Sequence, residues 1–274
     1  MTPPLAVAPE PRCRERTAAA RVRAVERAVQ AMRERLGEPL PLETIARAAL
    51  SSPYHFNRFF REVTGLPPCR FLAALRLETA KRLLLTTRFS VTRVCYEVGY
   101  TSIGSFTRHF ASDVGLPPYR LRRFASGGVP RPVLDGEGVE SRPASGATVG
   151  GRVDAPGGFG GMVFVGAFPE AIPRGRPAAC AVLAGPGEFR MGGLPDGRWH
   201  VLAAGLDGVP SADALLHDDA LRAAAGPVLV RDGRASGPVR LALRPPRPID
   251  PPILISLPVL LAGAGAEEAR TTAG

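Results

Sequence analysis

The stretch FNRFFREVTGLPPCR, residues 56–70, has a counterpart fifty positions later in FTRHFASDVGLPPYR, residues 106–120. In each copy two phenylalanines stand four residues apart, Phe56 and Phe60 in the first, so both lie on one face of a helix. The arginine two positions after the first phenylalanine lies about 200° further round the helix and points away from that face. A repeat at a fixed offset indicates that one structural unit occurs twice.

Each copy also carries signals for the start and the end of its helix. Gly65 and Gly115 can adopt the left-handed conformation that closes a helix, and two prolines soon follow each glycine. Ser52 and Ser102 stand at the other end as candidate N-caps. A short apolar stripe precedes each serine, at Leu42, Ile45 and Ala46 in the first copy and at Val91, Val94 and Cys95 in the second.

A short helix, a tight turn and a second helix that bears an arginine form the helix-turn-helix plan, whose second helix enters the DNA major groove. One match is weak evidence, because many all-helical proteins contain a helical hairpin, whereas two matches at a fixed offset are strong evidence. Further helices are expected over residues 16–36 and 70–85. The helix over 70–85 is about 22 Å long. It can act as a spacer that holds the arginine-bearing helices of the two copies about one turn of B-DNA, roughly 34 Å, apart.

The two halves of the 274-residue chain differ in charge. Residues 1–125 contain 21 basic and 10 acidic side chains, a net charge of +11, whereas residues 126–274 contain 14 and 15, a net charge of −1. Nearly all the basic residues are arginine, which suggests codon bias, but that bias would act on both halves. The asymmetry therefore marks the first half as the one that faces a polyanion.

Four motifs of the first half follow one another in a fixed order: RLETAKRLL at 76–84, VCYEVGY at 94–100, SFTRHF at 105–110 and GLPPYR at 115–120. They resemble the signature of the AraC/XylS family of bacterial transcription regulators, and the resemblance covers about residues 20–124. It implies a seven-helix domain in which a linker helix joins two helix-turn-helix units, bound to adjacent major-groove segments of promoter or operator DNA. RNA polymerase is an implied protein partner. Family members usually carry a sensory domain before this pair, whereas in this sequence the pair comes first. The ligand chemistry of that sensory domain is therefore not implied here.

Two sets of DNA-contacting residues follow from the match by position and from side-chain chemistry. The base-reading candidates are Tyr54, Asn57, Arg58, Ile103, Gly104, Thr107 and Arg108. The phosphate-contacting candidates are Ser52, Arg61, Arg70, Ser102, Arg120, Arg122 and Arg123. The fork of an arginine suits guanine and the amide of an asparagine suits adenine. Because Ile103 and Gly104 are not polar, the second unit is expected to read fewer bases and to serve more for phosphate positioning. An ion pair within the domain, for example with Glu62 or Glu97, is the alternative role for any one arginine.

The pattern changes after residue 125. Residues 126–147 are rich in Gly, Pro and Ser without periodicity and predict a flexible linker. Residues 148–262 contain short apolar runs between turn residues, which predicts an all-β sandwich. The runs are 149–153, 162–168, 178–183, 188–191, 199–204, 227–230, 239–243 and 253–261.

One helix, over residues 211–224, is expected between these strands. The phrase GEFRMGGLPDGRWHVLAA at 187–204 resembles carboxypeptidase-regulatory-like, transthyretin-type sandwich domains. The chain is thus predicted to be multidomain, with a disordered start over 1–15, a helical DNA-binding domain over 16–125, the linker, the β-domain over 148–262 and a disordered tail over 263–274.

Other classes of site lack their sequence signals. The cysteines Cys13, Cys69, Cys95 and Cys180 show no C-x-x-C spacing, and no zinc-ligand pattern is present, so no metal and no cofactor is expected. The apolar run at 253–262 is too short to span a bilayer as a helix. We therefore expect a soluble, cytoplasmic, nucleoid-associated protein without a membrane partner.

The sequence predicts a transcription regulator that binds specific DNA and whose β-domain binds a small-molecule effector, a partner protein or a second copy of the chain. A nonspecific architectural DNA-binding protein is one alternative. A DNA-repair or hydrolytic enzyme fused to a DNA-binding domain is another. Repair methyltransferases fused to such helical domains need a reactive cysteine in a Pro-Cys-His context, whereas Cys180 lies between alanines, so no enzymatic activity is expected.

Overall fold

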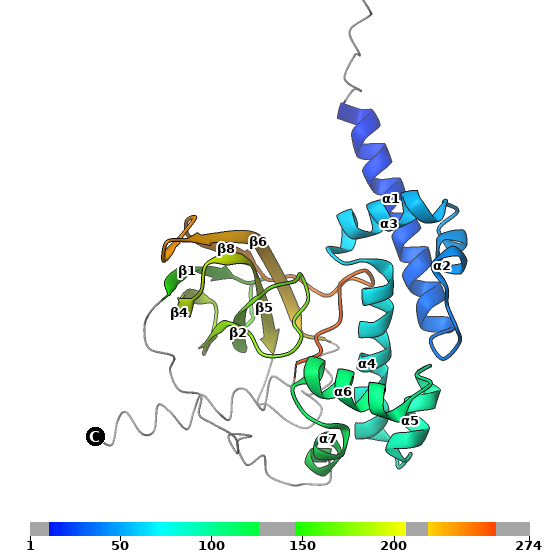
Figure 1. The fold of residues 1–274 in the computed structure, drawn as a ribbon. Coiled ribbons are helices and arrows are strands. Elements are labelled where there is room, and N and C mark those ends of the chain that lie inside the picture. Colours follow the sequence, from blue (N-terminus) through cyan, green and yellow to red (C-terminus); the bar gives the residue numbers. More distant parts are fainter. Residues whose placement is uncertain (1–10, 126–145, 207–218, 256–274) are drawn as a thin grey trace, which may run out of the picture.

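The computed structural model describes residues 11–125, 146–206 and 219–255. An all-helical part lies beside a β-rich part (Figure 1). The helices are α1 (Pro11–Glu34), α2 (Leu42–Ala48), α3 (Pro53–Thr64), α4 (Pro68–Thr86), α5 (Val91–Glu97), α6 (Ile103–Val114) and α7 (Pro118–Ala125). The strands are β1 (Ala147–Asp154), β2 (Met162–Phe168), β3 (Ala179–Leu183), β4 (Gly187–Leu194), β5 (Gly197–Leu206), β6 (Leu221–Arg231), β7 (Arg234–Ala235) and β8 (Val239–Ala242).

The repeated stretches form two similar helix pairs, α2 with α3 and α5 with α6. Their four repeated phenylalanines are fully buried, with ring centroids 5.2 Å apart for Phe56 and Phe60 and 5.6 Å apart for Phe106 and Phe110. Gly65 ends α3 at a φ of 78° and Gly115 ends α6 at a φ of 86°, so both glycines adopt the predicted left-handed conformation.

Helix α4 lies between the two pairs, with α3 toward one end and α6 toward the other (Figure 1). It is longer than expected, because Pro68 can occupy the first turn of a helix, where no backbone donor is needed. Its 19 residues give it a length of about 28 Å. Helix α1 is also longer than expected and begins at Pro11, five residues before position 16. It packs on the rest of the helices through Val25, Val29 and Met32, whose spacings of four and three place them in one apolar stripe along the helix.

The β-rich part contains two sheets whose strand orders are β4-β1-β8 and β3-β2-β5-β6-β7. Neighbouring strands are antiparallel except β1 and β8, which are parallel. A buried core joins the two sheets and includes Val149, Val163, Phe189, Val201 and Leu241. Side chains that alternate along a strand reach opposite faces, so only one face of the five-stranded sheet contributes to this core.

The other face of the five-stranded sheet is covered by residues 249–255, called the covering segment below. Phe164, Phe168 and Leu202 of the sheet pack there against Ile253 and Ile255. Burial on both faces explains why β2 is a continuous apolar run rather than an alternating one.

Two predictions for this region are wrong. Residues 253–255 form no strand, because they lie across the sheet face and not along a strand edge; the rest of the predicted strand lies outside the described residues. Residues 221–224 belong to β6 instead of a helix, because they pair with β5 from Gly205 to Leu202. Cross-strand pairing here overrides the helix propensity of an alanine-rich run. The earlier residues of that predicted helix, up to 218, also lie outside the described residues.

The helical and β-rich parts share buried contacts. Ile172, Ile249 and Leu254 of the β-rich part belong to the same buried cluster as the helix side chains. Lys81, in the middle of α4, is only 1% exposed, and its Nζ donates a hydrogen bond of 3.2 Å to the carbonyl oxygen of Ile253. The β-rich part is therefore packed on the helices rather than tethered at a distance from them.

Candidate nucleic-acid interface

Helix α3 presents a polar face opposite its buried phenylalanines. Tyr54 is 78% exposed, and Asn57, Arg58 and Arg61 are exposed as well. The predicted base-reading residues of the first unit thus share one accessible surface at the N-terminal half of α3. This is the part of a recognition helix that contacts base edges in helix-turn-helix complexes.

An ion-pair network holds Arg58. Its Nε donates to Oε1 of Glu62 at 3.1 Å, while Arg21 of α1 donates from Nη1 to Oε2 of the same carboxylate at 2.9 Å. The Arg58 side chain remains 74% exposed. Exposed pairs of this kind contribute little to stability, so a guanine or a phosphate can compete with Glu62 for the guanidinium group.

Helix α6 presents the corresponding surface of the second unit. Ile103 is 40% exposed, Gly104 and Arg108 are exposed, and Thr107 is half-buried. No ion pair joins Arg108 to a described residue. The Ser102 hydroxyl accepts a hydrogen bond from the backbone N–H of Ser105 at 3.5 Å, so it caps α6 as predicted.

The first unit starts differently. Ser52 stands at the N-cap position of α3, but its side chain makes no capping hydrogen bond. Pro53, the first residue of α3, supplies a preset helical φ in its place. The Ser52 side chain stays exposed at the start of the helix.

The predicted phosphate-contacting arginines divide into two groups. Arg61 and Arg123 are exposed and Arg120 is half-buried. The Nη2 atom of Arg70 lies 3.9 Å from a carboxylate oxygen of Glu170, so this arginine faces the β-rich part. Arg122 is half-buried, and its Nε and Nη2 atoms are shielded from solvent. Arg122 is therefore less accessible to a phosphate than Arg61 and Arg123, whereas Arg70 is 57% exposed but lies beside an acidic side chain.

A loop of the β-rich part contacts the C-terminal ends of both α3 and α6. This bridging loop, residues 169–175, follows β2. The side chain of Ala171 approaches Gly65 so closely that a Cβ atom at Gly65 would lie 2.8 Å from it. Arg174 donates from Nη1 to Oδ1 of Asp113 at 3.0 Å, and the backbone N–H of Gly175 donates to the carbonyl oxygen of Asp113 at 2.7 Å.

The sequence gives no signal for these contacts, because they join residues far apart in the chain. They leave the N-terminal halves of α3 and α6 uncovered, since the bridging loop packs at the opposite ends. Tyr54, Arg58 and Arg108 accordingly remain exposed with the β-rich part in place.

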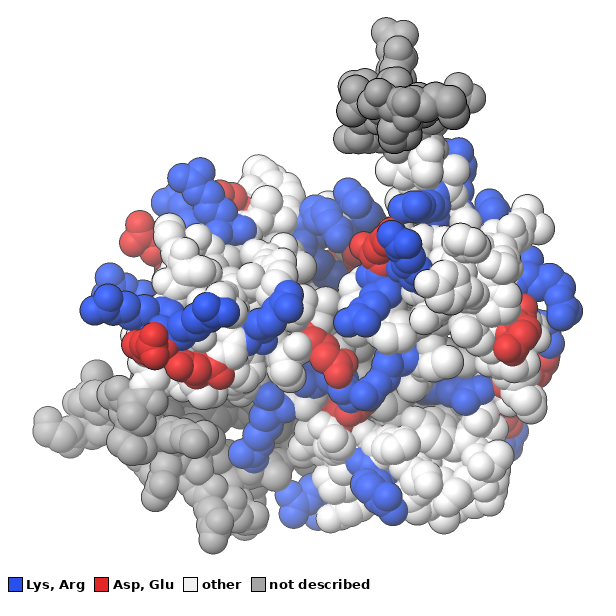
Figure 2. Space-filling view, turned by 45° about the horizontal axis from the view of Figure 1, so that its top comes forward, with Lys and Arg blue, Asp and Glu red and all other residues white. Residues whose placement is uncertain are grey.

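Charge alone does not outline the interface. On the face drawn in Figure 2, basic side chains are scattered over both parts of the molecule, with acidic side chains between them. The excess of basic residues in the first half is therefore distributed rather than gathered into one patch on this face. The candidate interface is defined instead by the two repeated helices and the residues that they expose.

Within the described residues, no helix is long and apolar enough to cross a membrane. In the same part of the chain, no group of three or more His, Cys, Asp or Glu side chains is placed to hold a metal ion.

Residues 45–123, which run from α2 into α7, match the protein family described as "Helix-turn-helix domain". Among curated proteins, the uncharacterized HTH-type transcriptional regulator YobQ of Bacillus subtilis is 36% identical over 88 residues, 32% of this chain and 36% of YobQ. The bifunctional transcriptional activator/DNA repair enzyme AdaA of the same species is 28% identical over 88 residues, 32% of this chain and 42% of AdaA. This chain thus spans well under half the length of these relatives.

Among solved structures, this chain is similar to a transcriptional regulator (AraC-type DNA-binding domain-containing proteins) from Chromobacterium violaceum. The alignment covers 39% of this chain and 96% of that regulator, with 25% sequence identity and a TM-score of 0.38. The matched part of this chain is therefore similar to the helix-turn-helix regions of bacterial transcription regulators. The family match ends at residue 123, before the β-rich part begins.

Proposed function

We propose that this chain is a bacterial transcription regulator that binds specific double-stranded DNA through two adjacent major-groove contacts. In this proposal the pairs α2–α3 and α5–α6 are two helix-turn-helix units, and α3 and α6 are their recognition helices. One observation supports it most. Each helix buries an equivalent pair of phenylalanines and exposes the opposite face at its N-terminal half. Two such faces on one chain suit two neighbouring grooves of a duplex better than a single groove.

The first unit carries most of the base reading in this proposal. Arg58 contacts guanine O6 and N7, Asn57 contacts adenine N6 and N7, and Tyr54 lies against the neighbouring base or backbone. In the second unit Arg108 has no competing ion pair with a described residue, and Thr107 lies one position before it. Ile103 and Gly104 offer only apolar surface, which suits the methyl group of thymine.

Phosphate contacts hold the two helices in register. Ser52 and Ser102 lie at helix N-termini, where phosphate oxygens are favoured by backbone donors. Arg61, Arg120 and Arg123 are the accessible basic candidates beside them. Arg122 takes part instead in packing at the edge of the helical region, as its half-burial suggests, and Arg70 lies beside the carboxylate of Glu170.

The β-rich part is proposed to be a sandwich of the carboxypeptidase-regulatory or transthyretin type, supported by its two sheets and their shared core. Its role is to sense or to dock: an effector, RNA polymerase or another partner protein, or a second copy of the chain. The chain has no catalytic role in this proposal. AdaA combines regulation with DNA repair by its name, but its match covers only 88 residues, 32% of this chain.

Selection from a random DNA pool tests the proposal. The full chain should enrich one motif, and its affinity for that motif should exceed its affinity for random DNA by roughly 10³-fold or more at physiological salt. Equal affinity for selected and random DNA would instead support a nonspecific architectural protein. Arg152→Ala, on the exposed surface of β1, is the control that should leave both affinities unchanged.

A further inference from the structure

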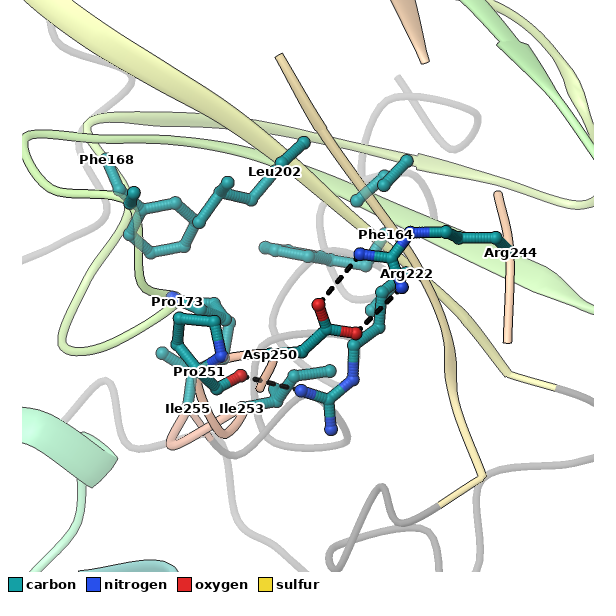
Figure 3. Close-up of a pocket in the computed structure, with 15 residues that line it drawn as sticks. Phe164, Phe168, Pro173, Leu202, Arg222, Arg244, Asp250, Pro251, Ile253 and Ile255 are labelled. Atoms are coloured by element: carbon teal, nitrogen blue, oxygen red, sulfur yellow. Dashed lines mark hydrogen bonds and ion pairs between the residues drawn. The ribbon is translucent and has the colours of Figure 1, made fainter. Parts of the chain in front are cut away.

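A cavity of about 70 Å³ lies between the five-stranded sheet and the covering segment. Strands β2 and β5 contribute Phe164, Phe168 and Leu202, and the covering segment contributes Ile253 and Ile255 (Figure 3). Its walls are therefore mainly aromatic and aliphatic. Ligand sites in proteins combine such walls with a few placed polar groups.

The polar groups of this cavity are two arginines and one aspartate. Arg244 forms a two-point contact with Asp250, from Nη1 at 2.8 Å and from Nη2 at 2.7 Å. Arg222 donates from Nη1 to the carbonyl oxygen of Pro251 at 2.6 Å, while its Nε is buried without a hydrogen-bond partner among the described residues (Figure 3).

This arrangement leaves one positive charge in excess at the cavity. Asp250 is already neutralised by Arg244, and the nearest hydrogen-bond partner of Arg222 is a neutral carbonyl group. Burial lowers the pKa of Arg222; the charges of Asp250 and Glu78 oppose that shift, but Arg244 and Arg33 pair with these two carboxylates. Arginine nevertheless stays protonated in proteins, so an anion in the cavity would meet an undercompensated guanidinium group.

The walls of the cavity are also connected to α6 and to α4. Pro173 of the bridging loop lines the cavity, and its carbonyl oxygen accepts hydrogen bonds from Leu254 at 3.0 Å and Ile255 at 3.3 Å. Two residues further along the same loop, Gly175 is bonded to Asp113 at the end of α6. On the other side, the carbonyl group of Ile253 holds Lys81 of α4.

We propose that this cavity is a binding site for a short, branched apolar carboxylate, and that its occupancy changes the affinity of the chain for DNA. The hydrocarbon part lies among Phe164, Phe168 and Leu202, and the carboxylate pairs with Arg222. The first half of the proposal depends only on the cavity, whereas the second half rests on the proposed function.

The size of the cavity limits the ligand. One water-sized volume occupies about 10–15 Å³ on the same scale, so 70 Å³ accommodates roughly five to seven non-hydrogen atoms. Isovalerate has a carboxylate and a branched chain of this size. It is therefore a suitable probe, and 3-methyl-1-butanol is its uncharged counterpart.

Calorimetric titration of the full chain with isovalerate, without DNA, tests the site. We expect one site per chain and, because a charge-assisted hydrogen bond is lost, binding of the alcohol at least about tenfold weaker. Arg222→Met should weaken isovalerate binding by a similar factor. Arg231→Met, at the exposed end of the same strand, is the matched control and should leave it unchanged.

A second variant guards against a folding defect in Arg222→Met. Ala224 lines the cavity and is exposed, so Ala224→Leu fills the mouth of the cavity without crowding the core. It should abolish isovalerate binding while the unfolding transition stays in place. Absence of isovalerate binding to the unaltered chain, or unchanged binding to both variants, would overturn the site. Equal binding of the acid and the alcohol would overturn the role of Arg222.

The link to DNA is tested separately. Saturating isovalerate should change the affinity for the selected DNA motif by at least about fivefold, and Ala224→Leu should remove this response without removing DNA binding. Isovalerate that binds without any change in DNA affinity would overturn the link. If the chain binds no specific DNA, the proposed function is contradicted. The titration without DNA still tests the cavity as a binding site in that case.

Discussion

Helices α3 and α6 are built on the same buried frame but expose different chemistry. Phe56 and Phe60 of α3 correspond to Phe106 and Phe110 of α6, and all four are fully buried. On the exposed side, α3 carries an arginine paired with Glu62, whereas α6 carries an arginine that pairs with no described residue. The comparison shows that the repeat keeps the buried residues that pack each helix, whereas the exposed residues differ between the two copies.

The buried frames themselves are not identical. The ring of Phe60 also contacts Phe71 edge-on, with centroids 5.4 Å apart. The position fifty residues after Phe71 is Leu121, which is buried but not aromatic. Phe60 therefore has an aromatic neighbour that Phe110 lacks, whereas in the second unit Phe106 has an extra contact with Tyr100, with centroids 5.3 Å apart.

Truncation of the buried phenylalanines should have the largest effect. Phe60→Ala and Phe110→Ala should each lower the free energy of unfolding of the chain by about 3–5 kcal/mol. Phe60→Ala should cost about 0.5–1.5 kcal/mol more, because it also loses the edge-on contact with Phe71. Chemical unfolding monitored by circular dichroism measures both, and a larger loss for Phe110→Ala would contradict the comparison.

Removal of the two exposed arginines should separate the units by what they read. Arg58→Ala should cost about 1–3 kcal/mol at the specific site and relax base preference at one position. Arg108→Ala should cost less, because its neighbours Ile103 and Gly104 offer no polar group to the same base step. Binding isotherms on selected and random DNA give both values. Equal losses on the two kinds of DNA would rule out base reading by Arg58.

The basic residues of α7 should differ in their salt response. Arg123→Ala should reduce the slope of log affinity against log salt by about one, because Arg123 is exposed. Arg122→Ala should change this slope less, since its guanidinium group is partly shielded. Affinities measured over a range of salt concentrations compare the two, with Arg240→Ala on the exposed side of β8 as the control. A steeper response from Arg122→Ala would reverse the assignment.

The smallest expected difference concerns the two capping serines. Ser102→Ala should lower the free energy of unfolding by about 0.5–1 kcal/mol, because the hydroxyl group caps α6. Ser52→Ala should lower it less, since this serine makes no capping hydrogen bond in α3. Thermal unfolding without DNA measures the effect free of any phosphate contact. Equal losses would mean that both serines cap in solution.

Much of the helical fold could be predicted from the sequence, because its signals are local. The four-residue spacing of the phenylalanines, the closing glycines Gly65 and Gly115 and the apolar stripe of α1 each specify a helix on their own. The seven strands expected from Val149 to Leu243 are also found, because short apolar runs between turn residues suit strands whichever strand they pair with.

What could not be predicted depends on contacts between distant residues. Nothing near Arg70 in sequence indicates that Glu170 stands beside it, and nothing near Ile253 indicates that its backbone holds Lys81 of α4. The bridging loop and the covering segment were missed for the same reason. The DNA-contacting residues are exposed as predicted for α3, but their roles remain predictions until DNA is bound.

Hydroxyl-radical footprinting of the full chain on its selected DNA motif tests the central claim most directly. Two recognition helices on one face of a duplex should protect two backbone segments about one helical turn, roughly ten base pairs, apart. Arg58→Ala should weaken the first protected segment and Arg108→Ala the second. Protection confined to one groove, or no preferred site at all, would contradict the claim that both units bind the same duplex.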